Sequence, residues 1–153
     1  MNQVVVKQEK SGYQIVEAYK SLRTNLQFCG EDKKVIAVTS CTPNEGKSSV
    51  SMQLGISLAE SGKRVILIDA DLRKSVLLGR TKTQKSVRGL AHFLSGQATL
   101  EDVICSTNVK NFYMIYSGPF PPNPAELLGG KNFRSLLNAL RKVYDYVLSL
   151  IHI

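Results

Sequence analysis

The chain has 153 residues, enough for one domain with a substantial core and too few for two. With 43% apolar and 21% charged residues it has an ordinary soluble composition, and no apolar run approaches the length of a membrane span. Three widely spaced cysteines without a C-x-x-C pair argue against a disulfide framework or a metal cluster, and the first residues lack a signal peptide, so we expect a cytoplasmic protein.

The net charge is +8, and part of the basic excess lies between Arg73 and Arg88. Such a cluster fits an anionic membrane surface, an acidic substrate or nucleic acid. We favour a simpler interpretation, a solvated loop whose positive potential benefits a nearby nucleotide site. Aromatic residues that could stack on bases are absent from this segment, which argues against single-stranded nucleic acid.

The N-terminal part predicts a loose segment followed by a helix. We expect residues 1–13 to be flexible because they are largely polar, and residues 14–153 to form one domain. Between Gln14 and Phe28, apolar residues at spacings of 4, 3 and 4 predict a helix with one narrow apolar stripe, formed by Ile15, Tyr19, Leu22 and Leu26. A helix this short is marginal alone, so it must pack on another element.

A strand, a loop and a helix follow in the segment 35–49, VIAVTSCTPNEGKSS. This order directs backbone N–H groups and the positive end of a helix toward one point, which is typical of a phosphate site. In such a site Lys47 bridges the β- and γ-phosphates, and the hydroxyl of Ser48 is a ligand of Mg²⁺. The motif G-x-x-x-x-G-K-[ST] is imperfect because Cys41 replaces its first glycine. The alternative is a glycine that merely lets a strand turn into a helix.

A second motif begins with four consecutive apolar residues at 65–68, which predict a central parallel strand. Asp69 and Asp71 follow at its carboxyl end, where ligands bind in open α/β sheets. Burying unpaired carboxylates there costs several kcal/mol each, which indicates a bound cation or a role in proton transfer. The alternative is a solvated Asp-x-Asp turn capped by Arg73.

The region between these motifs and the remainder of the chain predict further helices and strands. A helix from 47 to 60 ends at Gly62, and Thr99 and Asn123 are in position to cap later helices. We expect His92 to be a packing residue, because no second His or Cys stands at ligand spacing. The later elements are a helix at 90–94, a helix from 100 to about 105, a strand at 112–116, a helix that begins at Pro124, a helix at 133–143 and the start of a strand at 144–147.

Five segments in order resemble the cytoplasmic kinase domain of the bacterial tyrosine kinases of capsule and exopolysaccharide synthesis: EAYKSLRTNLQF, TSCTPNEGKSS, VILIDADLRK, GLAHFLSG and PPNPAELL. The resemblance covers roughly residues 15–147. It implies an α/β fold of the P-loop NTPase type, a three-layer sandwich around a mainly parallel sheet that is incomplete at the C-terminus. It also implies ATP, Mg²⁺ and transfer of phosphate to tyrosine.

The resemblance also implies the site residues. It assigns catalytic roles to Lys47, Asp69 and Asp71, and metal binding to Ser48, Asp69 and Asp71. Which aspartate holds the metal and which accepts the tyrosine proton stays open. The residues assigned to nucleotide binding are Thr42, Pro43, Asn44, Glu45, Gly46, Lys47, Ser48, Ser49 and Arg73.

Oligomerisation is a further implication. The family carries E-x-x-R-x-x-R on the first helix, which joins subunits into a ring, and Glu17, Lys20 and Arg23 stand at those positions here. Lys20 lacks the planar fork of arginine, which weakens a bidentate contact. The other implied partners are tyrosine-containing protein substrates and a membrane-embedded polysaccharide co-polymerase that activates the kinase at the inner face of the plasma membrane. We expect no nucleic acid.

The end of the sequence departs from the family's pattern. Leu150 occupies the place of the Walker B aspartate, which holds Mg²⁺ through water, and Asp145 is not a substitute because it lies at the start of the strand. The family's C-terminal tyrosine cluster, the target of autophosphorylation, is absent. We expect either a truncated piece of a kinase domain or a natural short variant, with weak nucleotide binding or none.

Two other functions stay open. A partition or cell-division switch ATPase would bind DNA or membrane without phosphorylating protein, but that class carries a second lysine where Thr42 stands here. An inactive remnant that only docks on partners is the other, and Leu150 is its best support.

Overall fold

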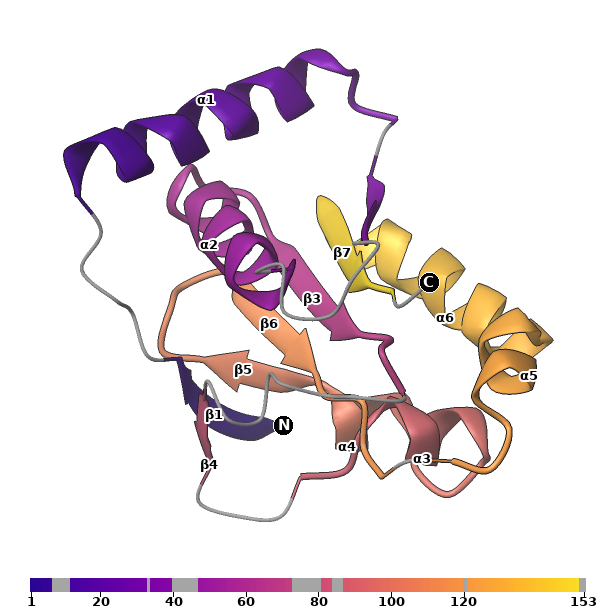
Figure 1. Ribbon diagram of the computed structural model, residues 1–153. Coiled ribbons are helices and arrows are strands. Elements are labelled where there is room, and N and C mark those ends of the chain that lie inside the picture. Colours follow the sequence, from indigo (N-terminus) through magenta and orange to yellow (C-terminus); the bar gives the residue numbers. More distant parts are fainter. Residues whose placement is uncertain are drawn as a thin grey trace.

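The computed structural model describes residues 1–6, 12–32, 34–39, 47–72, 81–83, 87–119 and 121–151. In these ranges one seven-stranded sheet lies between two layers of helices (Figure 1), which confirms the expected α/β class. The elements in chain order are β1 (Asn2–Val6), α1 (Tyr13–Phe28), β2 (Val35–Val38), α2 (Lys47–Glu60), β3 (Val65–Asp69), β4 (Thr81–Thr83), α3 (Leu90–Leu94), α4 (Leu100–Val103), β5 (Cys105–Thr107), β6 (Phe112–Ile115), α5 (Pro124–Gly129), α6 (Lys131–Val143) and β7 (Tyr146–Leu150).

The sheet is mainly parallel and has the strand order β2-β7-β3-β6-β5-β1-β4. Strands β2, β7, β3 and β6 all run in one direction, so their carboxyl ends meet at one edge of the sheet. Strand β5 is antiparallel to β6, and β1 is parallel to β5. Strand β7 lies between β2 and β3, so the end of the chain's last strand is brought beside both sequence motifs.

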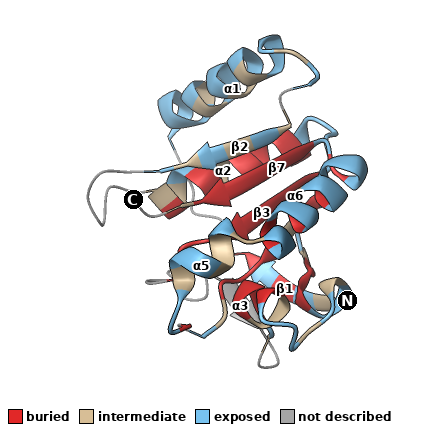
Figure 2. Ribbon diagram, turned by 90° about the vertical axis from the view of Figure 1, so that its right-hand side faces the viewer, coloured by how far each residue is buried: buried red, intermediate tan, exposed pale blue. Residues whose placement is uncertain are grey.

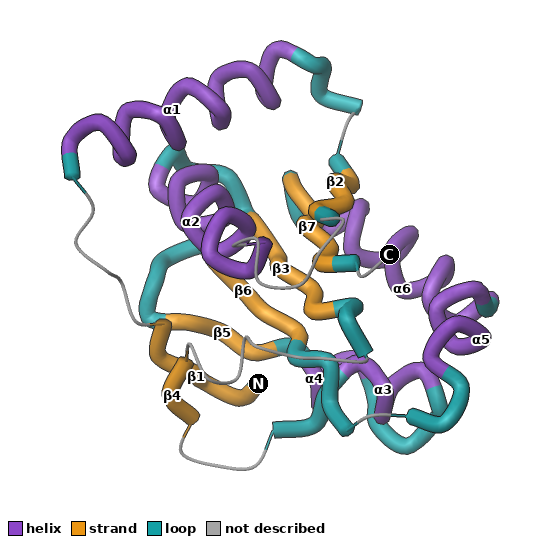
Figure 3. Tube along the Cα trace, in the orientation of Figure 1, coloured by secondary structure: helices purple, strands orange, loops and turns teal. Residues whose placement is uncertain are grey.

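The core has two halves, one on each face of the sheet. Figure 3 shows the helices that cover these two faces. Alternate residues of β3 face opposite layers: Leu67 packs toward α2, and Ile66 packs toward α6. All five residues of β3 are buried, which explains why its sequence is an uninterrupted apolar run before Asp69. Helix α2 approaches the sheet closely, since a Cβ on Gly55 would lie 2.5 Å from a ring carbon of Phe112.

The expectation of a loose N-terminus was wrong for residues 2–6. These residues form β1, which pairs with β5 and β4, and both Val4 and Val6 are 2% exposed. The side chain of Asn108 fixes the end of the strand, because its Oδ1 accepts from Val6 N at 2.7 Å and its Nδ2 donates to Val6 O at 3.4 Å. The three consecutive β-branched valines at 4–6 were the available sequence signal.

Helix α1 begins one residue before the predicted start and lies against α2 (Figure 1). Its predicted stripe is only weakly covered. Leu26 packs partly against the core, whereas Ile15 and Leu22 are exposed. None of the residues in α1 is buried.

Helix caps and boundaries differ in detail from the predictions. Thr99 caps α4 as predicted, and its Oγ1 accepts from Asp102 N at 3.3 Å. Helix α4 ends at Val103, earlier than predicted, because Cys105 begins β5. Asn123 precedes α5 but its side chain donates to Glu126 Oε2 at 2.9 Å, so the predicted side-chain cap was wrong.

Candidate active site

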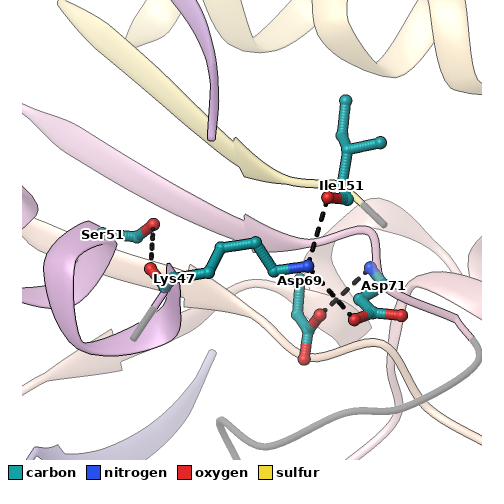
Figure 4. Close-up of polar contacts among 5 residues, drawn as sticks. All are labelled: Lys47, Ser51, Asp69, Asp71 and Ile151. Carbon is teal, nitrogen blue, oxygen red and sulfur yellow. Dashed lines mark hydrogen bonds and ion pairs between the residues drawn. The ribbon is translucent and has the colours of Figure 1, made fainter. Parts of the chain in front are cut away.

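Lys47 and the two aspartates of the second motif come together at the carboxyl edge of the sheet. Lys47 is the first residue of α2, and its Nζ lies 3.3 Å from Asp71 Oδ2 and 3.1 Å from the carbonyl oxygen of Ile151 (Figure 4). The ammonium group therefore joins three segments: the start of α2, the loop after β3 and the residue after β7. The two motifs share one location, as a common phosphate site requires.

The start of α2 is held by its own first turn and by the core. The hydroxyl of Ser51 donates to the carbonyl oxygen of Lys47 at 2.7 Å. Ser48 is 6% exposed, and Ser49 is half-buried. Because the apolar face of α2 is buried against the sheet, the helix start and Lys47 are fixed relative to β3.

The two aspartates are buried and linked to each other. Asp69 is 1% exposed and Asp71 is 8% exposed. The backbone N–H of Asp71 donates to Asp69 Oδ1 at 3.1 Å, which holds both carboxylates at the end of β3 (Figure 4). Two carboxylates and one ammonium group therefore lie together in a poorly hydrated place, an arrangement that is compatible with a bound cation.

The donor set fits Mg²⁺ only together with a bound phosphate. Within the described ranges, no cluster of three or more His, Cys, Asp or Glu residues could hold a metal ion alone. Mg²⁺ in nucleotide sites takes one or two carboxylates, and substrate phosphates and water complete its coordination. Asp69, Asp71 and the buried hydroxyl of Ser48 supply a set of that kind, so the residues present fit a metal–nucleotide pair.

Strand β7 places Leu150 at the centre of this edge. Leu150 is 1% exposed and lies in register with Val38 of β2 on one side and Asp69 on the other. Asp145 lies before the opposite end of β7, where its Oδ2 accepts from Arg64 N at 2.9 Å. The predicted positions of Leu150 and Asp145 relative to the site therefore agree with the structure.

Several predicted residues cannot be placed. Thr42, Pro43, Asn44, Glu45, Gly46 and Arg73 lie outside the described residues. One participant was missed: the carbonyl oxygen of Ile151, which accepts from Lys47. A backbone carbonyl leaves no mark in the sequence, and only the proximity of the end of β7 could have indicated it.

The residues predicted for oligomerisation lie on α1 and not at the site formed by Lys47 and the aspartates. Glu17 Oε1 and Lys20 Nζ are 3.5 Å apart and form an exposed pair within the helix. Arg23 points toward α2 instead, where its Nη1 donates to the carbonyl oxygen of Ser57 at 3.0 Å. In this chain Arg23 therefore fixes α1 on α2.

Comparisons with known proteins add the family context. A family model described as an AAA domain matches residues 33–149. Tyrosine-protein kinase CpsD of Streptococcus agalactiae is 42% identical over 132 residues, which are 86% of this chain and 58% of that protein. The kinase domain of the Escherichia coli tyrosine kinase ETK is 35% identical with a TM-score of 0.83, over 90% of this chain and 54% of that one.

A more distant structure represents the rival class. The septum site-determining protein MinD of Pyrococcus horikoshii, complexed with Mg-ADP, is 27% identical to this chain with a TM-score of 0.62. The match covers 76% of this chain and 47% of the MinD chain. The P-loop fold shared by these proteins implies that the present chain binds a nucleotide. The chain spans 58% of the length of the Streptococcus agalactiae protein and smaller shares of some other curated kinases that it matches. No helix in the described ranges is both long and apolar enough to span a bilayer.

Proposed function

Because the chain belongs to the family of bacterial tyrosine kinases of capsule and exopolysaccharide synthesis, we propose that it forms the nucleotide-binding part of an ATP-dependent protein-tyrosine kinase. The observation that carries this proposal is the contact between Lys47 and Asp71, next to Asp69, at the carboxyl edge of the sheet. A kinase of this kind needs little covalent chemistry from the protein. It needs fixed charges around a phosphoryl group.

Each residue in the proposal has a separate task. Lys47 would bind the phosphates of the nucleotide, and residues 42–49 are the predicted phosphate-binding loop. Ser48 and one of the two aspartates hold Mg²⁺, which neutralises phosphate charge when bound. The other aspartate orients the tyrosine hydroxyl and accepts its proton. Arg73 supplies a further cation near the nucleotide.

The proposal extends to partners and location. The substrates are tyrosine-containing proteins, and activation comes from a membrane-embedded co-polymerase that recruits the chain to the inner face of the plasma membrane. The exposed Glu17–Lys20 pair on α1 supports a contact between subunits in a ring. The side chain of Arg23 donates to Ser57 of α2, so it can contribute to such a contact only after this hydrogen bond breaks.

Two observations weigh on the rival functions. The chain is closer in fold to the Escherichia coli kinase domain than to MinD, which favours the kinase over a switch ATPase. The apolar Leu150, buried next to Asp69, favours a site that binds the metal–nucleotide pair weakly. An inactive docking remnant is therefore the second candidate.

Nucleotide binding and phosphotyrosine formation separate these candidates. We expect the chain to bind a fluorescent ATP analogue with Mg²⁺, and Lys47→Met to abolish that binding, while Lys63→Met, at an exposed lysine before β3, retains it. Phosphotyrosine should appear when the chain is mixed with the cytoplasmic segment of a co-polymerase activator. Retained binding by Lys47→Met would contradict the assigned phosphate site. ATP hydrolysis with DNA binding and no labelled tyrosine would favour the switch ATPase.

A further inference from the structure

Helix α6 carries a basic outer face that the proposed catalysis does not use. Its sequence, KNFRSLLNALRKV, contains four cations and no acidic residue. At 100° per residue, Lys131, Arg134, Arg141 and Lys142 fall within an arc of about 100°. The buried residues Phe133, Leu136 and Leu140 lie on the opposite side of the helix. We call this arc the α6 basic face.

The α6 basic face is exposed and its charge is not neutralised locally. All four cationic residues are exposed, and Figure 2, which looks onto this side of the molecule, shows the outer surface of α6 in pale blue. Across the described part of the chain, no acidic side chain forms an ion pair with any of the four. Lys34 adds a further cation at the C-terminal end of the helix, where its Nζ lies 3.5 Å from the carbonyl oxygen of Arg141.

The nearest acidic residues along the chain have other partners. Glu126, before the helix, accepts from the side chain of Asn123. Asp145, after it, accepts from the backbone N–H of Arg64. The positive potential of α6 therefore extends into solvent over the length of a 13-residue helix, about 20 Å.

The side chains on the α6 basic face indicate the kind of partner that it suits. The cations lie near both ends of the helix, and no exposed aromatic side chain lies among them to stack on bases or to anchor a peptide. The apolar side of the helix packs into the core, so the α6 basic face has no apolar side chain to insert into a partner except the exposed Val143 at its end. This combination suits a broad anionic surface.

We propose that the α6 basic face binds the anionic phospholipid surface of a membrane. The contact is peripheral and reversible, because a charge-only attachment is weaker than one with an inserted chain. It deepens the proposed location at the inner membrane face and supplies a second attachment beside the co-polymerase. It does not depend on phosphoryl transfer.

The test is co-sedimentation with vesicles of phosphatidylcholine that contain about one third phosphatidylglycerol, compared with vesicles of phosphatidylcholine alone. Each cation near an anionic leaflet strengthens binding about fivefold. Arg134→Gln/Arg141→Gln should therefore weaken binding to the anionic vesicles about 25-fold. The matched control, Lys63→Gln/Lys110→Gln, removes the same charge from exposed positions before β3 and β6 and should change binding less than about twofold. Binding of the unmodified chain should fall steeply with added salt.

Four outcomes would overturn the inference: no preference for anionic vesicles, equal losses in both variants, binding to an acidic peptide but not to vesicles, or tighter binding to duplex DNA. Far-ultraviolet circular dichroism and binding of the fluorescent ATP analogue are measured on the same samples. If ATP binding fails while vesicle binding persists, the proposed function fails and this inference stands. The reverse pattern rejects only the inference.

Discussion

The contact between Lys47 and Asp71 can be measured by a double-mutant cycle. At the observed 3.3 Å, two unit charges attract with about 5 kcal/mol at an effective dielectric constant of 20. Their side chains are only 13% and 11% exposed, so part of this attraction is offset by lost hydration. We expect a net coupling of about 1–2 kcal/mol in the free energy of unfolding.

The cycle uses substitutions that keep the size of each side chain. Lys47→Met should cost about 2–3 kcal/mol, because it removes the cation from Asp71 and the donor from the carbonyl of Ile151. Asp71→Asn should cost about 1–2 kcal/mol, because Lys47 keeps its bond to Ile151. The double variant should cost less than the sum of the two single variants by the coupling energy.

The assay is urea unfolding followed by circular dichroism at low and high salt. A largely buried pair is screened less than a surface pair, so the coupling should persist at about 0.5 M salt. The exposed pair of Glu17 and Lys20 provides the comparison, and its coupling should be below about 0.5 kcal/mol. If the costs of Lys47→Met and Asp71→Asn add within about 0.3 kcal/mol, the two side chains do not interact in solution and the shared site is refuted.

Three further predictions test other parts of the molecule. Leu150→Asp should lower the free energy of unfolding by about 3 kcal/mol or more without ligand, because it buries a third carboxylate beside Asp69. Mg²⁺ with ATP should recover part of this loss. Equal losses with and without ligand would contradict the assigned site. Asn108→Ala should cost about 1–2 kcal/mol and increase hydrogen exchange at Val6 N–H, whereas unchanged exchange would contradict its role in β1. Burial raises the pKa of Cys105 from its ordinary 9.0 to about 11, so the unfolded chain loses this proton first and stability should fall from pH 9 to pH 11. Cys105→Ala should make this fall smaller, and the part that remains includes Tyr144 and Tyr146, whose pKa values are also raised by burial.

The sequence predicted the structure best where a local residue pattern alone determines the element. Strand β3 is apolar on both faces because helices cover both sides of the sheet, and the run of four apolar residues followed by Asp69 showed this directly. The convergence of Lys47 with Asp71 also followed from local signals. Each motif was expected at the carboxyl end of a parallel strand, and such ends share one edge of the sheet.

Contacts between distant segments explain the errors. Strand β1 depends on β5, on β4 and on the side chain of Asn108, which is 102 residues from Val6, so the three valines at 4–6 indicate a strand but not its partners. Helix α4 is shorter than predicted because Cys105 pairs with Asn2 in the sheet, and this pairing overrides a weak helical signal. Asn123 binds Glu126 three residues later, a side-chain contact that competes with capping.

Charge balance connects the site to its proposed cycle. Without a ligand, Lys47 is shared between Asp71 and the carbonyl of Ile151, while Asp69 remains close to Asp71. In the proposed cycle a triphosphate would bring several further negative charges to this edge, beside Lys47 and the two carboxylates. We propose that Mg²⁺ would accompany the nucleotide and would be held beside Asp69 and Asp71. Leu150 lies in register with Val38 and Asp69, so among the described residues the donors that we propose for this cation are Asp69, Asp71 and Ser48. Its binding would then depend on the phosphates that arrive with it.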